Sequence, residues 1–92
     1  MHYVWDSRKD VENRRTHGLA LVDGIPALED PNAEAWIDDR VAYGEERILT
    51  LGLNQVRVLL VVTTELAEDV TRIISVRRAE KYEERWYYEG KP

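Results

Sequence analysis

The sequence predicts an α+β fold in which an antiparallel sheet of about four strands packs against two to three helices. Three observations predict it. Strand-like runs rich in β-branched and apolar residues cluster between residues 47 and 78. Helix-like stretches precede and follow these runs, and the links between the runs are short enough for hairpins. With 92 residues, the chain fits one domain that spans residues 1–92.

A short strand and a surface helix open the chain. Residues 3–5 are strand-like, and Asp6 or Ser7 can then cap a helix that continues to about His17. Val11 is the only aliphatic residue of this helix, so its apolar stripe is thin. We therefore expect the helix to lie on the surface with its arginine-rich side in solvent.

Residues 19–39 are expected to form an irregular helix, a turn and then an edge strand. Residues 19–28 are apolar but contain a glycine and a proline, which favours a short, irregular helix. The Asp-Pro-Asn sequence at 30–32 predicts a turn. Residues 33–39 are expected to form an edge strand, and a polar loop follows through Tyr43 and Gly44.

Three strands and a closing helix complete the fold. Residues 47–53, 56–64 and 70–78 are strand-like and follow one another closely, which predicts an antiparallel meander. The run at 56–64 is apolar on both faces, as in a central strand. Residues 79–88 are expected to form a helix whose apolar residues recur at i, i+3 and i+7.

Several absences narrow the function. The chain has no cysteine, and His2 and His17 are its only histidines. A disulfide scaffold, a thiolate nucleophile and a multi-histidine metal centre are therefore not expected, and neither is a cofactor. The longest apolar run covers residues 58–62, and the first residues lack a signal-peptide pattern. We expect a cytoplasmic protein that does not associate with a membrane.

The charge is negative overall but unevenly distributed. The chain has 18 acidic and 13 basic residues, for a net charge of −5. Residues 23–46 hold eight acids and one base, so the rest of the chain carries 10 acids and 12 bases. Because exposed charges are screened over about 8 Å at physiological salt, a small cationic site can exist despite the total.

Arginines are the first candidate functional residues. Arginine supplies 10 of the 13 basic residues, and its planar guanidinium binds phosphate oxygens bidentately. Regular alternation along residues 70–78 predicts Arg72 and Arg78 on one face and Arg77 on the other. Arg47 opens a neighbouring strand. Arg47 and Arg72 can instead pair with carboxylates such as Glu46 or cover the sheet with their stems.

Histidine and carboxylate side chains are candidates for proton transfer. His17 can donate or accept a proton near neutral pH, although at a helix end it can simply complement the helix dipole. The pair Glu45-Glu46 precedes the Arg47 strand and can supply a base or remain solvated. The aromatic residues Trp36, Trp86, Tyr87 and Tyr88 can stack on nucleobases. Core packing of Trp86 and partner contact or plain exposure of the tyrosines is the favoured alternative.

Short motifs spread over the chain resemble the BrnT-type toxin family. They are, in order, Trp5-Asp6, Asn13, His17-Gly18, Asp30-Pro31, Tyr43-Gly44-Glu45-Glu46-Arg47, Gly52, and the segment from Arg72 to Ala79. The last segment is similar to the family's RIISARRA motif, and the resemblance covers residues 3–88. One departure is that Thr16 stands where the family usually has a lysine.

The resemblance implies a toxin of a type II toxin–antitoxin pair with a RelE-like ribonuclease fold. Such a toxin would cleave RNA without a metal ion and so inhibit translation. It would be neutralised by a BrnA-type antitoxin in a hetero-oligomer, and it would reach operator DNA only through that antitoxin.

The resemblance also assigns expected roles to individual residues. His17 or Glu46 would transfer protons, and Arg47, Arg72 and Arg77 would bind the scissile phosphate. Further contacts to RNA would come from three more arginines, Arg14, Arg15 and Arg78. We expect the catalytic side chains to converge at one end of the sheet.

Two other functions compete with this interpretation. The first is a catalytically weak, toxin-like module that binds a protein partner, which Thr16 favours. The second is a DNA-binding regulator. The sequence shows no helix-turn-helix with a basic recognition helix, which argues against the regulator.

Overall fold

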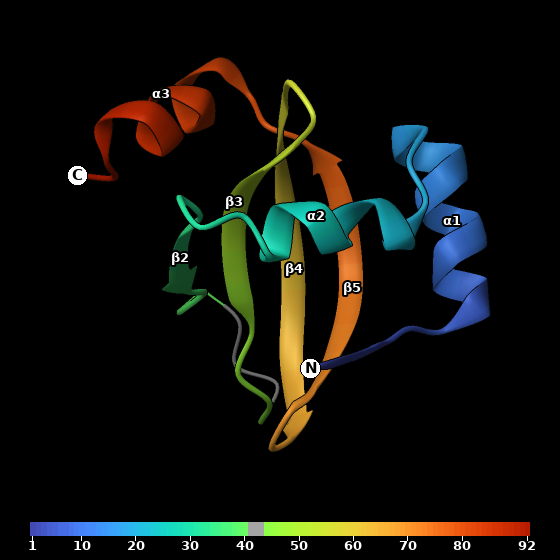
Figure 1. Ribbon diagram of the computed structural model, residues 1–92. Helices are drawn as coiled ribbons and strands as arrows, with labels where there is room; N and C mark the ends of the chain where they lie inside the picture. The colour runs from blue at the N-terminus through green and yellow to red at the C-terminus, as the bar shows by residue number, and fades with distance from the viewer. Residues whose placement is uncertain (41–43) are drawn as a thin grey trace.

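The computed structural model describes residues 1–40 and 44–92 and confirms the α+β class (Figure 1). In the described residues, a five-stranded sheet with the order β1-β5-β4-β3-β2 packs against helices. Tyr43 of the expected polar loop lies outside the described residues. The elements are β1 (His2–Val4), α1 (Ser7–His17), the 3₁₀ turn η1 (Leu21–Gly24), α2 (Ile25–Leu28), β2 (Glu34–Ile37), β3 (Ile48–Asn54), β4 (Arg57–Ala67), β5 (Val70–Arg78) and α3 (Lys81–Glu89).

The expected meander is confirmed, with β4 between β3 and β5 in antiparallel pairing. The strand β2 lies at one edge of the sheet, as expected. At the other edge, β1 pairs with β5 in parallel, which short-range patterns do not predict. In the part of the chain that the structure describes, no helix is both long and apolar enough to span a membrane.

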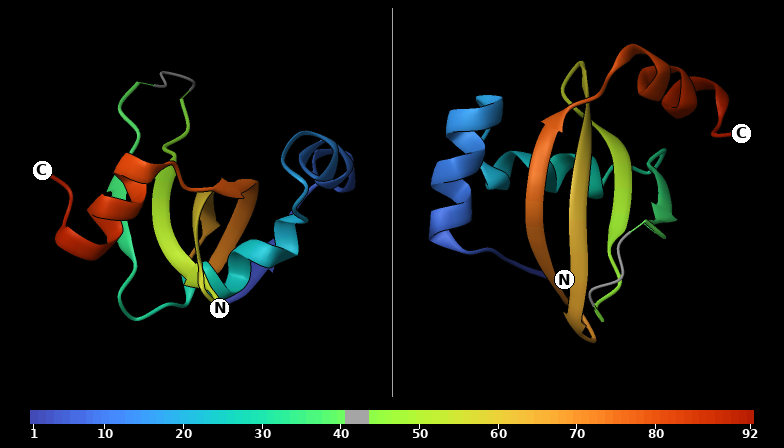
Figure 2. Two further views of the ribbon diagram at one scale, coloured as in Figure 1. Left: turned by 90° about the horizontal axis from the view of Figure 1, so that it is seen from above. Right: turned by 180° about the vertical axis from the view of Figure 1, so that it is seen from behind.

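Each face of the sheet has its own apolar core. The helices η1 and α2 cross one face, here called the α2 face, and α3 covers part of the opposite α3 face (Figure 2). Leu21 and Ala27 pack on the α2 face against Leu59, Val61, Ile73 and Val76. On the α3 face, the core consists of Leu49, Leu51, Val58 and Leu60, with Trp36, Trp86 and Tyr87 packed against them. Helix α2 lies very close to β3, because a Cβ at Gly52 would be 2.0 Å from the Ala27 carbonyl oxygen.

A register shift in β5 corrects one expectation. Ser75 pairs with Val62, but Ile73 pairs with the next residue, Thr63, so Ile74 is an extra residue on β5. Such a bulge reverses the alternation of side chains beyond it. The prediction that Arg72 shares a face with Arg78 is therefore wrong: Arg72 lies on the same face as Arg77.

One buried amide holds α1 against the sheet. Asn13 is the buried residue of α1 and is 6% exposed, whereas Val11 is 56% exposed. Asn13 Nδ2 donates to the carbonyl oxygens of Leu19 and Val76, each at 2.8 Å, and Asn13 Oδ1 accepts from the Val76 N–H at 3.0 Å. The side chain thus binds the edge of β5 as a neighbouring strand would. Hydrogen bonds, rather than an apolar stripe, fix this helix.

Helix α3 is held at its start by an ion pair. It begins at Lys81 rather than at 79, because Ala79 still donates its N–H to Val58 and so prolongs the sheet pairing. Arg77 donates from both Nη atoms to the Glu83 carboxylate at 2.8 and 2.9 Å, and Glu83 also accepts from the Glu80 N–H. Burial alone would raise the pKa of Glu83, but these hydrogen bonds and the Arg77 charge outweigh it and lower that pKa below 4.5.

A second contact holds the far end of α3. The Tyr87 hydroxyl donates to the Asp30 carboxylate, which also accepts from the N–H groups of Leu53 and Asn32. Burial and the neighbouring carboxylate raise the pKa of Tyr87 to about 12. Asp30 therefore joins α3, β3 and the turn before β2.

The Asn13 amide makes a testable contribution to stability. Asn13→Ala would leave the N–H and C=O of Val76 without their partners, and each such group costs about 1–3 kcal/mol. We expect the free energy of unfolding to fall by at least about 2 kcal/mol, measured by urea denaturation. Glu12→Ala, at an exposed position of the same helix, is the control. Equal stabilities of the two variants would disprove this role.

The Arg77–Glu83 pair predicts a pH dependence. Because the folded-state pKa of Glu83 lies below 4.5, its stabilisation is complete above that pH and is lost as the pH falls through the folded-state pKa. Glu83→Gln should lower the free energy of unfolding by about 1–2 kcal/mol at pH 7. The gap to the wild-type protein should narrow below pH 4.5, whereas Glu84→Gln should produce almost no gap. A gap that stays constant down to pH 3 would contradict the assignment.

Candidate functional site

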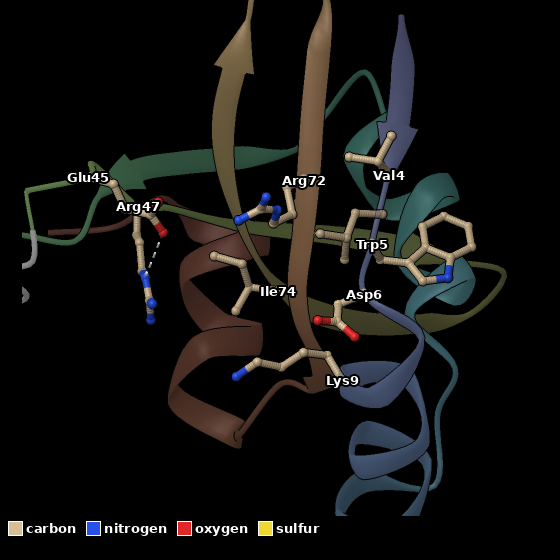
Figure 3. Close-up of a pocket in the computed structure, with 9 residues that line it drawn as sticks. Val4, Trp5, Asp6, Lys9, Glu45, Arg47, Arg72 and Ile74 are labelled. Atoms are coloured by element: carbon tan, nitrogen blue, oxygen red, sulfur yellow. Dashed lines mark ion pairs between the residues drawn. The ribbon is translucent and has the colours of Figure 1, made fainter.

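A cationic pocket of about 350 Å³ opens on the α3 face, where β1 runs into α1 beside β5 (Figure 3). Its charged lining residues are Lys9, Arg47, Arg72, Asp6 and Glu45, and its other lining residues are Val4, Trp5, Ile73 and Ile74. The pocket thus combines three cations and two carboxylates with four apolar lining residues. Guanidinium and ammonium groups grouped in this way are suited to bind phosphate oxygens.

Three separate elements bring these cations together. Arg72 comes from β5, where the bulge turns it toward the α3 face. Arg47 directly precedes β3, and its Nε lies 4.0 Å from a Glu45 carboxylate oxygen. Lys9 extends from the first turns of α1, and Figure 3 shows the side chains of all three bordering one opening. Because none of the three is a sequence neighbour of another, only the fold assembles the group.

His17 lies in a second pocket that adjoins the first. This pocket has a volume of about 200 Å³ and shares Lys9 and Ile74 with the cationic pocket. Its other lining residues are Glu12, Asn13, Thr16, His17 and Ser75. The histidine is exposed at the end of α1 and can approach a molecule that spans both pockets.

Lys9 lines both pockets, although the sequence analysis did not single it out. Lys9, Asn13 and His17 are spaced four residues apart, so they lie along one side of α1. Asn13 is the residue that faces the sheet, and Lys9 and His17 therefore border the same surface before and after it. This spacing could have identified Lys9 if Asn13 had been recognised as the buried residue.

Arg77 does not join the cationic pocket. It pairs with Leu60 across the sheet, whereas Arg72 pairs with Thr64, so the two arginines are about 13 Å apart along β4. Arg77 is bound to Glu83 and lines a different pocket beside α3. The expectation that all catalytic candidates converge at one sheet end is therefore wrong for Arg77, although it is correct for Arg47 and Arg72.

The other expected site residues also lie apart from this pocket. Glu46 is exposed and accepts a hydrogen bond from Thr64 at its backbone carbonyl, while its neighbour Glu45 lines the pocket. Arg14 is paired with Asp10 on α1 at 3.2 Å. Arg15 is exposed on α1, and Arg78 is exposed on β5 and directed to the α2 face through its pairing with Leu59.

Metal ligands are not grouped in the described part of the chain. Within residues 1–40 and 44–92, no three His, Cys, Asp or Glu side chains lie together as a metal site would require. Asp6 is engaged as the N-cap of α1, where its side chain accepts from the Arg8 N–H at 2.8 Å.

Comparison with known proteins agrees with the fold and with the motifs. The family model of the ribonuclease toxin BrnT of type II toxin–antitoxin systems matches residues 5–83. The crystal structure of the Brucella abortus ribonuclease toxin BrnT superimposes with a TM-score of 0.66 at 21% sequence identity, covering 88% of this chain and all of that one. A search of curated proteins finds no significant match. The family match spans most of the chain, which therefore belongs to the BrnT family of ribonuclease toxins of type II toxin–antitoxin systems.

Proposed function

We propose that this toxin cleaves RNA without a metal ion, at the cationic pocket of Lys9, Arg47 and Arg72. The observation that carries the proposal is the convergence of these three cations from separate elements, next to the pocket of His17. Cleavage of cellular RNA would inhibit translation in the cytoplasm. A BrnA-type antitoxin would neutralise the toxin in a hetero-oligomer and carry it to operator DNA.

The chemistry needs groups of two kinds. Without a metal ion, the 2′-oxygen of the ribose forms a bond to phosphorus while the bond from phosphorus to the 5′-oxygen breaks. A base must accept the proton of the 2′-hydroxyl, and an acid must protonate the leaving 5′-oxygen. Cations must stabilise the negative charge that develops on the phosphoryl oxygens. The products are a 2′,3′-cyclic phosphate and a free 5′-hydroxyl.

The cations suit the second requirement. Arg47 and Arg72 offer planar guanidinium donors from two strands, and Lys9 offers an ammonium group from the opposite side of the opening (Figure 3). A phosphate placed among them would contact positive charge from three directions. Removal of one such donor typically lowers catalysis by about 10²- to 10³-fold.

For proton transfer, His17 and Glu46 remain the candidates from the family resemblance, and Glu45 is the other candidate carboxylate from the sequence. His17 adjoins the cationic pocket through Lys9, and Glu45 lines the pocket itself. Glu46 is the next residue along the chain and is exposed. We favour His17 as one partner, because its pocket adjoins the cationic pocket that would hold the phosphate.

A weak, partner-binding module remains the second candidate, because Thr16 lines the pocket of His17 where the family usually has a lysine. However, Lys9 lines that same pocket and supplies an ammonium group there. The pocket of His17 therefore keeps one ammonium group despite Thr16, which favours an active ribonuclease. Growth distinguishes the two: induced alone, the toxin should arrest growth unless the neighbouring antitoxin is co-expressed, whereas the module should permit normal growth.

Charge-neutral variants test the pocket directly. Arg72→Gln and Lys9→Gln keep most of each side chain but remove its charge, and each should lower the rate of RNA cleavage by about 10²-fold. Arg85→Gln and Lys81→Gln, at exposed positions of α3, are the matched controls and should cleave at the wild-type rate. If Arg72→Gln cleaves RNA as fast as its control, this pocket is not the active site.

Cleavage in EDTA and the chemical end of the product test whether the mechanism is independent of a metal ion. The pH–rate profile tests which residue transfers the proton. Cleavage should persist in EDTA and leave a 2′,3′-cyclic phosphate end. His17→Gln should lower the rate by about 10²- to 10⁴-fold and remove one limb of the pH–rate profile. Glu45→Gln and Glu46→Gln, measured in parallel, identify the second group. Loss of activity in EDTA that Mg²⁺ restores would refute the metal-independent mechanism.

A further inference from the structure

Three aromatic rings form a cage between β2 and α3, away from the cationic pocket. Trp36 of β2 and Trp86 of α3 meet edge to face with centroids 5.8 Å apart, and Tyr82 meets Trp86 in the same way at 5.0 Å. They line a pocket of about 400 Å³ that also includes Asp38 and Asp39. Edge-to-face packing leaves ring faces available to a further group.

A side chain of the same molecule shows which chemistry suits this cage. The ammonium group of Lys91, in the segment after α3, lies 5.1 Å from the centre of the Trp36 ring and 5.2 Å from that of Trp86. Both distances are within the range of about 6 Å for cation–π attraction. The cage therefore accepts an alkylammonium group, and Lys91 holds it through a short, exposed segment.

The strand beside the cage can accept a further strand. Among the described residues, β2 pairs with β3 alone and forms the edge of the sheet. Ile37 of this strand is 55% exposed. An extended segment of a partner can add to such an edge through backbone hydrogen bonds, and its alternate side chains then point toward the same face as Trp36.

The charge around this edge selects the partner. The stretch 34–39 carries three carboxylates, Glu34, Asp38 and Asp39, and no basic residue. The two guanidinium groups in the cage pocket, those of Arg40 and Arg77, are each paired with a carboxylate. An RNA backbone would be repelled at this edge, whereas a peptide with a lysine side chain would be attracted.

We propose that the antitoxin docks here, by adding an extended segment to the free edge of β2 and placing a lysine side chain in the cage in place of Lys91. This inference rests on the proposed function, because it takes the antitoxin as the partner. The docking surface is distinct from the cationic pocket. Lys91 is an internal competitor that the antitoxin must displace.

The first test examines the cage without any partner. N-acetyl-lysine-methylamide is titrated into the wild-type protein and into Lys91→Gln while the indole N–H resonances are followed by NMR. The signals of Trp36 and Trp86 should shift in a saturable manner, and Trp5, in the cationic pocket, is the internal control. Lys91→Gln should bind two- to fivefold more tightly, since a cation–π contact at an exposed site has about that strength.

The uncharged analogue N-acetyl-norleucine-methylamide separates a cation site from an apolar cleft. It should leave the indole signals of Trp36 and Trp86 almost unchanged. The cage assignment is overturned if both compounds cause equal shifts, or if Lys91→Gln shows no shift with the lysine compound.

The second test measures affinity for the antitoxin encoded beside the toxin. Trp36→Leu should weaken binding at least tenfold, as expected for an aromatic anchor, and Lys91→Gln should tighten it two- to fivefold. Tyr88→Leu, at an exposed aromatic outside the cage, should bind like the wild type. All three variants should cleave RNA at the wild-type rate.

The outcomes separate this inference from the proposed function. A wild-type toxin that does not bind the antitoxin refutes the proposed partner, and the lysine titration still decides whether the cage binds cations. The inference is wrong if the wild type, Lys91→Gln and Trp36→Leu all bind the antitoxin with the same affinity. The antitoxin would then dock elsewhere.

Discussion

The hydrogen bonds of the Asn13 side chain determine how α1 lies on the sheet, and the cationic pocket depends on them. Asn13 satisfies both the N–H and the C=O of Val76, so α1 can neither rotate nor slide without leaving buried backbone groups unpaired. With the rotation of α1 fixed, Lys9 and His17 must border the sheet one turn before and one turn after Asn13. A structural amide thus positions two groups that we assign to chemistry.

The bulge at Ile74 is a second local feature on which the pocket depends, because it turns Arg72 toward the α3 face. The motif from Arg72 to Ala79 looks regular, and period-two alternation separates Arg72 from Arg77. The extra residue Ile74 instead places Arg72 and Arg77 on the same face. It also lets Ile73 and Val76, which are three residues apart, enter the same core. The strands themselves were predictable because their apolar patterns are long. The bulge was not, since it depends on how the β4 and β5 residues pack.

Much of the site lay beyond sequence reasoning for the same reason. Arg47 and Arg72 were expected at one end of the sheet, and both line the pocket, because they lie in or next to strands whose order was predicted. Arg77 was misplaced, because its partner Glu83 lies in the next element and the contact exists only once α3 folds back. Lys9 was missed, because a helix with one aliphatic residue gives no apolar stripe from which to orient it. Longer-range contacts decided each of these cases.

Two regions of opposite charge lie on the α3 face of the sheet, although the net charge of the chain is −5. The acidic stretch lies along β2 and its flanking residues, where Asp38 pairs with Arg40. Nearby, Glu83 of α3 pairs with Arg77, and the aromatic cage holds the ammonium group of Lys91. The cationic pocket extends from Arg47, which precedes β3, to β1 and α1 at the opposite edge. Arg47 of the pocket also contacts the acidic stretch, because its carbonyl oxygen accepts a hydrogen bond from the Asp38 N–H at 2.8 Å, so the two regions meet at this residue. In the proposed function, the side of this pocket formed by Lys9 and Arg72 would bind the polyanion and the edge of β2 would bind the basic peptide, because the strand order places β1 and β2 at opposite edges of the sheet.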